Sequence, residues 1–238
     1  MKMKVILDKK PKNPIIIEGF PGFGLVGTIT TEFLIRHLKA KEIGRIRIKE
    51  VPPVIAVHEG EAVEPLGIFY DPKTNIVILH ALTDVKGIEW ALADAICKLA
   101  KDLNAKEVIS IEGIGSSSER PSSGGNAFFV GDGDHKKLAK TGAKELREGI
   151  IMGVSGALLV KRNLKTTFIF AETVNNFPDA RASAKIIDVL DKYLGLKIDP
   201  KPLIKKAEDF ERQLRELMEK TQQSKEQIAT KKNLSYLG

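Results

Sequence analysis

The chain has 238 residues, of which 42% are hydrophobic and 29% charged. This composition excludes a collagen-like or wholly disordered protein and is sufficient for one large domain with its own core. No apolar run reaches the roughly 20 residues of a spanning helix, and the first residues do not resemble a secretory leader, which predicts a cytoplasmic protein without membrane contact. A lone cysteine, Cys97, argues against a disulfide framework or a cysteine-based metal cluster.

The net charge of +7 comes from 38 basic and 31 acidic residues that are interleaved along most of the chain. Aromatic residues make up 6%, and none alternates with arginine in a nucleic-acid recognition pattern. A solvated surface is therefore favoured over a nucleic-acid-binding face. Binding to DNA or RNA is therefore ranked behind the two functional hypotheses given below. It would make the retention of the protein on nucleic acid strongly salt-dependent.

The first half of the chain reads as alternating short strands and one helix. β-branched runs and turn residues indicate the strands, and apolar residues at helical spacing indicate the helix. In chain order the predicted elements are strands at 5–7 and 15–17, a helix from 22 to 38, strands at 43–48 and 54–57, and a hairpin of 68–70 and 76–79.

The second half alternates helices and strands more regularly, and a loop rich in Gly, Ser and Pro spans 113–126. Its predicted elements are a helix at 88–103, strands at 108–111 and 128–130, helices at 136–147 and from 149, a strand at 167–171 and a helix at 179–193. Amphipathic helices between strands predict a three-layer α/β fold with a mostly parallel sheet and helices on both faces.

Beyond residue 200 the pattern changes, which predicts an α/β domain at 1–200 followed by a C-terminal segment at 201–238. The first part of that segment repeats apolar residues at alternating spacings of four and three, as at heptad a and d positions. Two interpretations stay open, a helix packed on its own domain and an oligomerisation helix between subunits. The seam consists of Leu203, Ala207, Phe210, Leu214 and Leu217.

A glycine pattern offers the strongest enzymatic hypothesis. Gly22-Phe-Gly24-Leu-Val-Gly27 lies after a predicted strand and before a helix, as in dinucleotide-binding folds. The alternative is a tight strand-to-helix turn, favoured by the bulky residues Phe20, Phe23 and Leu25 in and before the pattern. A nucleotide- or nucleoside-binding enzyme that uses Gly22 to Gly27 remains the second functional hypothesis.

Two further patterns resemble catalytic or metal motifs but fit ordinary structure better. Gly153-Val-Ser155-Gly156-Ala157 resembles a nucleophile elbow, yet its last position is Ala and every His precedes Ser155. Asp132-Gly-Asp134-His135 is also typical of a turn and a helix start with Asp134 as the N-cap. We therefore predict no catalytic residue, no metal site and no cofactor.

Two carboxylates at strand ends form a weaker site hypothesis. Glu112 and Glu172 each follow a predicted strand, and the carboxyl ends of parallel strands meet at one edge of a sheet. The two side chains are therefore expected to approach one another.

Four segments in a fixed order carry a family resemblance. GFPGFGLVGTITTEFLI (19–35) is followed by a Glu-Gly-Ile-Gly segment (112–115), by GVSGALL (153–159) and by AETVNNFPDARASAKIIDVLDKYLGL (171–196). Together they resemble the PAC2 family, the homologues of proteasome assembly chaperone 2, and most closely its archaeal members. The resemblance covers about residues 19–202.

The resemblance implies a phosphorylase-like α/β fold without catalysis that serves as a homo-oligomeric scaffold, such as a small ring. It also implies 20S proteasome α subunits, or a related adaptor protein, as partners in assembly or activation. Some members end in a hydrophobic–Tyr–any-residue motif that docks between α subunits. The corresponding residues, expected on a flexible tail, are Leu234, Tyr236, Leu237 and Gly238, with Tyr236 third from the end rather than penultimate.

Overall fold

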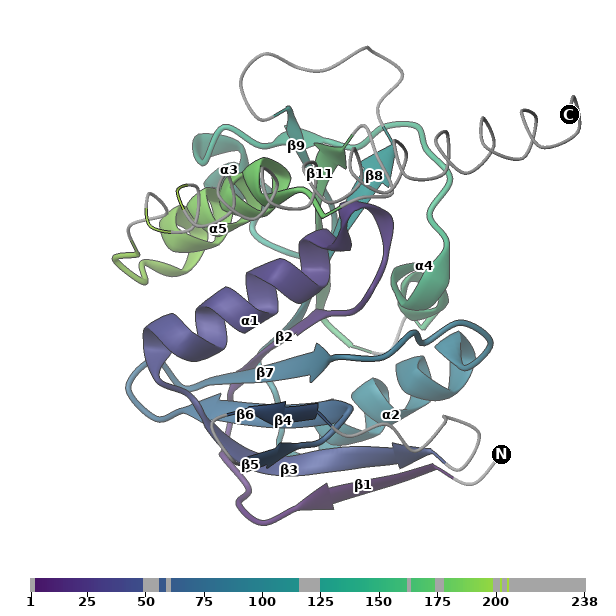
Figure 1. Ribbon diagram of the computed structural model, residues 1–238. Coiled ribbons are helices and arrows are strands. Elements are labelled where there is room, and N and C mark those ends of the chain that lie inside the picture. Colours follow the sequence, from purple (N-terminus) through teal and green to yellow (C-terminus); the bar gives the residue numbers. More distant parts are fainter. Residues whose placement is uncertain are drawn as a thin grey trace, which may run out of the picture.

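The computed structural model describes residues 3–48, 56–58, 61–115, 125–161, 164–173 and 178–198, with 202 and 205, and for 56–58 and 61–63 it describes the backbone alone. Within these ranges the chain forms one nine-stranded mixed sheet with helices on both sides, and a separate two-stranded hairpin (Figure 1). The α/β architecture predicted from the alternation of strands and helices is confirmed.

The element bounds follow the order of the chain. The strands of the large sheet are β1 (Met3–Leu7), β2 (Ile15–Gly19), β3 (Lys41–Ile48), β6 (Leu66–Asp71), β7 (Ile76–Ala81), β8 (Glu107–Gly115), β9 (Ala127–Gly131), β10 (Lys144–Glu145) and β11 (Thr166–Thr173), and the hairpin is β4 (Ala56–His58) and β5 (Glu61–Val63). The helices are α1 (Val26–Leu38), α2 (Glu89–Asp102), α3 (His135–Lys140), α4 (Gly153–Leu159) and α5 (Ala180–Leu194), with a 3-10 turn, η1 (Phe23–Leu25), before α1.

The parallel strands occupy the centre of the large sheet, whose order is β1-β3-β6-β7-β2-β8-β11-β9-β10. β7, β2, β8 and β11 run parallel, whereas β1, β3 and β6 on one side and β9 on the other pair antiparallel. The short turn between β6 and β7 permits only an antiparallel pair, and parallel neighbours need the longer helical crossovers. The predicted mostly parallel arrangement therefore holds for the centre of the sheet, where the strands are buried on both faces.

Alternate residues of the central strands point to two separate cores. One core includes Ile17 and lies under α1 and α5, and the other includes Ile16 and lies under α2 and α4. This period of two follows from the pleat of a strand. It assigns the side chain of every central-strand residue to a known face of the sheet.

Helix α5 has the ends that its sequence predicts. The Asp179 carboxylate accepts a hydrogen bond from the backbone N–H of Ala182 at 2.9 Å, and Gly195 ends the helix in the left-handed conformation with φ of 71°. An N-cap of this kind contributes about 1 kcal/mol. The predicted range of 179–193 for α5 is confirmed to within a residue at each end.

The helix predicted at 136–147 is much shorter in the structure. α3 ends at Lys140, Gly142 adopts a φ of +90°, and residues 144–145 form β10 beside β9. A positive φ at Gly142 cannot belong to a right-handed helix. The glycine therefore ends the helix despite the charged, helix-favouring residues that follow it.

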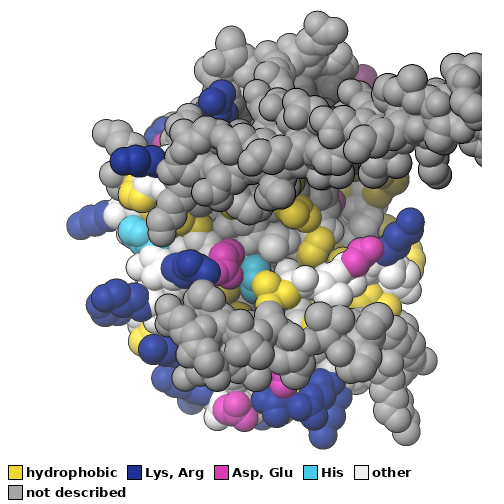
Figure 2. Space-filling view, in the orientation of Figure 1, with side chains coloured by type: hydrophobic (Ala, Val, Ile, Leu, Met, Phe, Trp, Pro, Cys, Tyr) yellow, Lys and Arg dark blue, Asp and Glu magenta, His cyan; other side chains and the backbone are white. Residues whose placement is uncertain are grey.

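The described surface has no single concentration of positive charge on the side seen in Figure 2. Lys and Arg side chains are spread around the rim and are interrupted by Asp, Glu and apolar side chains. This distribution supports the interpretation of the +7 charge as a solvated surface. Among the described residues, none of the helices has the length and apolar character needed to cross a bilayer.

Candidate functional site

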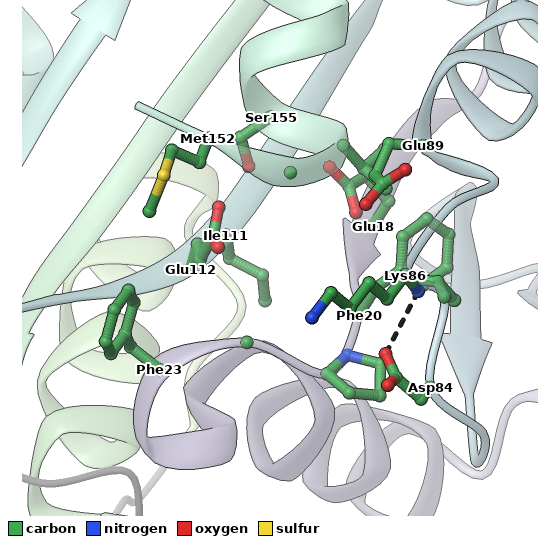
Figure 3. A pocket seen from close by; sticks show the side chains of 15 residues that line it. Glu18, Phe20, Phe23, Asp84, Lys86, Glu89, Ile111, Glu112, Met152 and Ser155 are labelled. Carbon is green, nitrogen blue, oxygen red and sulfur yellow. Dashed lines mark hydrogen bonds between the residues drawn. The ribbon is translucent and has the colours of Figure 1, made fainter. Parts of the chain in front are cut away.

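A pocket of about 550 Å³ opens at the carboxyl ends of the two central strands β2 and β8 (Figure 3). Ligands commonly bind at this edge of open α/β sheets, where the connections from adjacent strands leave toward opposite faces. Here β2 leads to α1 on one face, and β7 leads to α2 on the other. The lining residues are Glu18, Phe20–Phe23, Asp84–Lys86, Glu89, Ile111, Glu112 and Met152–Ser155.

Strand alternation places three polar side chains on the α2 and α4 face of the sheet. Glu18 on β2 follows Ile17, which faces α1 and α5, so Glu18 points the other way. Ser110 and Glu112 on β8 flank Ile111, which also faces α1 and α5. All three side chains therefore share one face with Ser155 of α4, although they come from separate parts of the chain.

Glu18 is the most deeply buried of these groups, with 2% of its surface exposed. Burial raises its pKa from 4.5 to about 8, and the neighbouring Glu112 adds to the rise against the opposing effect of a hydrogen bond from Ser110. Its Oε1 has no hydrogen-bond partner among the described residues. An unpaired polar atom in a protein interior costs free energy, so this carboxyl group needs an explanation beyond folding.

Two serines connect Glu18 to the second carboxyl group of the pocket. The hydroxyl of Ser110 bonds to Glu18 and lies 2.9 Å from the hydroxyl of Ser155, which in turn bonds to Glu112. Burial raises the pKa of Glu112 as well, and the Ser155 bond partly opposes that rise. The two glutamates are thus held at either end of a chain of hydroxyl groups.

The mouth of the pocket combines charged and aromatic side chains. Lys86, Glu89 and Asp84 come from the segment that leads into α2, and the Lys86 side chain points toward the centre of the pocket in Figure 3. Asp84 accepts a hydrogen bond from the Lys86 backbone N–H at 3.0 Å, which shapes this turn. Phe23 lies on the opposite rim and is 40% exposed.

The glycine pattern at 22–27 serves close packing rather than phosphate binding. A Cβ on Gly19 would lie 2.5 Å from the Gly27 carbonyl oxygen, so α1 meets β2 backbone to backbone. A Cβ on Gly22 would lie 2.8 Å from Oε1 of Glu112, so a carboxylate occupies the space beside the turn. A phosphate there would meet negative charge, which disfavours the predicted nucleotide role for this loop.

The remaining enzyme-like patterns have structural explanations. Ser155 is buried in α4 and bonds to Ser110, while His80 lies on the other face of the sheet, 2.8 Å from the Thr31 hydroxyl of α1. Asp134 is the N-cap of α3, as predicted, and accepts from the Lys137 backbone N–H at 2.9 Å. No group of three or more His, Cys, Asp or Glu suited to a metal ion exists within the described part of the chain.

Glu112 and Glu172 were expected to approach one another, but only Glu112 is among the described residues that line the pocket. Glu172 on β11 instead accepts hydrogen bonds from the backbone and side-chain N–H groups of Asn126, at 2.9 and 2.8 Å. The partner of Glu112 in the pocket is Glu18, which sequence reasoning missed. The signal was a single charged residue inside an apolar run that reads as a buried strand.

The predicted oligomerisation seam and tail lie outside the described residues. This applies to Leu203, Ala207, Phe210, Leu214 and Leu217, and to Leu234, Tyr236, Leu237 and Gly238. Their roles stay predictions.

The fold and the pocket define a class of protein, a three-layer α/β domain with a parallel centre and a carboxyl-lined pocket at its edge. The chain belongs to the PAC2 family, whose model matches residues 16–218. The resemblance inferred from the four ordered segments is therefore confirmed.

The chain is similar to PbaA of Pyrococcus furiosus, an archaeal homolog of proteasome-assembly chaperone. The two share 32% identity over 98% of this chain and 99% of PbaA, with a TM-score of 0.80. PbaB of the same organism, an archaeal proteasome activator, has the same fold at 21% identity, with a TM-score of 0.74 over 91% of this chain and 98% of PbaB. An uncharacterized protein of Methanocaldococcus jannaschii is 29% identical over 87% of each chain.

Proposed function

We propose that the chain is a non-enzymatic scaffold for proteasome assembly or activation. In this proposal it forms a homo-oligomer in the cytoplasm, and its C-terminal tails bind 20S proteasome α subunits or a related adaptor protein. The observation that carries the proposal is the 32% identity to PbaA across nearly the whole of both chains. PbaA is described as a homolog of proteasome-assembly chaperone.

Exposed apolar side chains near α2 and α4 support a protein-binding role. Trp90 is 58% exposed at the start of α2, and Val160 is 64% exposed just after α4, which packs against α2. Ile150 and Met152, in the segment leading into α4, are exposed as well. Trp90 and Val160 belong to one neighbourhood, because the ammonium group of Lys161, the residue after Val160, lies 5.8 Å from the centre of the Trp90 ring. Exposed apolar side chains of this size are typical of a surface that another protein covers, and aromatic residues are enriched in such contacts. The proposed occupant is a second copy of the chain.

The C-terminal segment supplies two further parts of the proposal. The heptad seam from Leu203 to Leu217 would add a helical contact between subunits, since a narrow apolar stripe suits a coiled coil. Residues 234–238 would then reach a partner from that assembly, with Tyr236 as an aromatic anchor.

Native mass spectrometry of the full chain, alone and with 20S α subunits, tests the proposal. We expect a homo-oligomer of defined stoichiometry and a complex with α subunits. Deletion of 234–238 should abolish the complex and leave the oligomer intact. An α-subunit complex that survives this deletion would rule out the tail as the binding element.

Two substitutions separate the surfaces that hold the oligomer together. Leu214→Glu charges the heptad seam, and Trp90→Ser removes the exposed indole of α2. Lys101→Ser, on an exposed position of α2, is the matched control. Dissociation with either test variant but not with the control identifies the contact. A monomeric parent chain would contradict the scaffold itself.

A further inference from the structure

The carboxyl-edge pocket has an unpaired hydrogen-bonding atom at its base. Oε1 of Glu18 is without a partner among the described residues although 98% of this side chain is buried. A structural carboxyl group in such a place normally has its oxygens satisfied, because desolvation without compensation costs free energy. A ligand that donates to Glu18 would supply the missing bond.

The size and lining of the pocket suit a small organic molecule. Its volume of about 550 Å³ lies within the usual range for ligand sites, roughly 300–1,000 Å³. Apolar surface comes from Phe20, Val85 and Val154, and polar groups converge on the floor from β2, β8 and α4. This combination of an apolar wall with a few placed polar groups is that of a binding site.

The charges in the pocket favour a positively charged ligand. Besides Glu18, the described residues of its lining carry the carboxyl groups of Asp84, Glu89 and Glu112 and one ammonium group, that of Lys86. These carboxylates are hydrogen-bond acceptors, so the complementary ligand carries N–H donors. The face of an aromatic ring such as Phe23 at the rim also attracts an organic cation.

Other ligand classes fit the lining less well. A phosphate near the glycine turn would approach Oε1 of Glu112, which occupies the space beside Gly22. Within the described residues, the side chains do not cluster in a way that would hold a metal ion. A ligand rich in N–H groups and carrying its own carbon skeleton satisfies both the acceptors and the apolar walls.

We propose that this pocket binds a small organic cation, an ammonium or guanidinium compound, whose N–H groups donate to Glu18 and Glu112. Met152 belongs both to the pocket lining and to the exposed apolar surface near α2 and α4, and the described lining residues all come from the part of the chain before residue 156. Ligand binding is therefore a property that the scaffold function does not require.

Binding of such a cation is coupled to the loss of a proton from Glu18. Ser110 and Glu112 of β8 act on this side chain directly, and the other polar and charged side chains of the described pocket lining are those of Ser155 in α4 and of Asp84, Lys86 and Glu89 in and before α2. Burial keeps the pKa of Glu18 at about 8, so the carboxyl group is mostly protonated at neutral pH. A bound cation stabilises the carboxylate, and affinity should rise as the pH approaches and passes that value.

Calorimetric titration of the full chain tests the proposal with putrescine, spermidine and agmatine as probes. The uncharged 1,4-butanediol is the matched control for putrescine. We expect at least one cation to bind, with an affinity roughly tenfold higher at about pH 9 than at about pH 6.5, and no binding of the diol. Proton release, read from the dependence of the heat on the buffer, should accompany binding.

Variants assign the binding to this pocket. Glu18→Gln and Glu112→Gln should each weaken cation binding by roughly tenfold or more, and Glu18→Gln should remove most of its pH dependence. Glu148→Gln, on an exposed position that is not part of the pocket lining, is the matched control and should bind like the parent chain. If a glutamate variant does not fold, Phe23→Ala at the rim replaces it, with weaker binding expected.

Three outcomes would overturn the proposal. The first is an absence of heat with all three cations at both pH values. The second is an equal loss with Glu148→Gln, which would indicate general counter-ion attraction. The third is binding of guanosine or NAD in place of the cations, which would favour a nucleoside site. None of these outcomes bears on oligomerisation or tail binding, so the scaffold proposal is tested separately.

Discussion

Two buried glutamates on the central sheet show how differently one protein can treat the same side chain. Glu107 begins β8 and faces α5, whereas Glu18 lies near the end of β2 and faces α4. Their exposed fractions are similar, 6% and 2%. They differ in partners, and that difference separates a group that holds the fold together from one that is available to a ligand.

Glu107 is surrounded by donors. The Tyr193 hydroxyl of α5 donates to its two oxygens at 2.9 and 3.2 Å, the Thr167 hydroxyl donates to it as well, and the Lys165 ammonium lies 3.6 Å away. These bonds offset the cost of burying a carboxylate and fasten α5 to the sheet. Among the described residues Glu18 has no comparable set of donors, and burial raises its pKa against the opposing hydrogen bond from Ser110.

Of the substitutions that test this comparison, Glu107→Leu should have the largest effect on the free energy of unfolding. The substitution leaves the buried hydroxyls of Tyr193 and Thr167 without their acceptor, so the free energy of unfolding should fall by about 4 kcal/mol. Urea unfolding measures the change, and Glu107→Gln, which keeps an acceptor oxygen, should lose less. A loss below about 1 kcal/mol for Glu107→Leu would show that the hydrogen bonds to Glu107 do not stabilise the fold.

Glu18→Gln should raise the free energy of unfolding, whereas Glu107→Leu lowers it, and the size of the gain should depend on pH. Because the folded-state pKa of Glu18 is about 8 and its ordinary value is 4.5, the folded chain keeps a proton that the unfolded chain has lost between these values. Stability of the parent chain therefore falls as the pH rises through this window, by about 1.4 kcal/mol per pH unit from this group.

The Glu18→Gln variant does not lose stability in this way as the pH rises, because glutamine does not titrate. Relative to the parent chain it should gain roughly 3 kcal/mol in the free energy of unfolding between about pH 5 and about pH 7.5. Urea unfolding of both proteins across that range measures the difference. Glu112, whose pKa is also raised, remains in both chains, and its repulsion of an ionised Glu18 exists only in the parent chain, where it is already part of the raised pKa of Glu18. Parallel pH curves would mean that Glu18 is not the buried acid described here.

Tyr193→Phe gives the smallest effect and sharpens the description of Glu107. The variant keeps the aromatic packing of α5 but removes the hydroxyl that donates to Glu107 and accepts from the Asp134 backbone N–H at 3.3 Å. We expect a loss of about 1–2 kcal/mol in thermal or urea unfolding. Tyr70→Phe, whose hydroxyl makes one part-buried bond to Asn75, is the control and should lose less.

The elements that the sequence predicts well are those whose ends are fixed by local chemistry. The turn at 71–75 forms because Asp71 accepts from the Thr74 backbone N–H at 3.0 Å, and α5 begins and ends where Asp179 and Gly195 require. Such signals act over a few residues and survive any tertiary arrangement. The helix predicted at 136–147 is longer than α3 because the positive φ of Gly142 ends the helix despite the helix-favouring residues around it.

The site was harder to predict because its residues meet only through the sheet. Glu112 was identified as a strand-end carboxylate, but its partner was expected to be Glu172, whose side chain bonds to Asn126 instead. Glu18 became a neighbour because β2 lies directly beside β8, with Glu18 opposite Ser110. Strand order is a long-range property, and the sequence alone does not specify it.

Gly19, next to Glu18, has a consequence for how this family can diverge. Position 19 faces α1 and has no room for a side chain, while position 18 faces open volume. A slip of β2 by one residue would drive Glu18 into the backbone of α1, so the strand has only one workable register. A substitution at residue 18 can therefore change the chemistry of the pocket without disturbing the close packing of β2 against α1. The strand allows new binding specificities on one side while it preserves the architecture on the other.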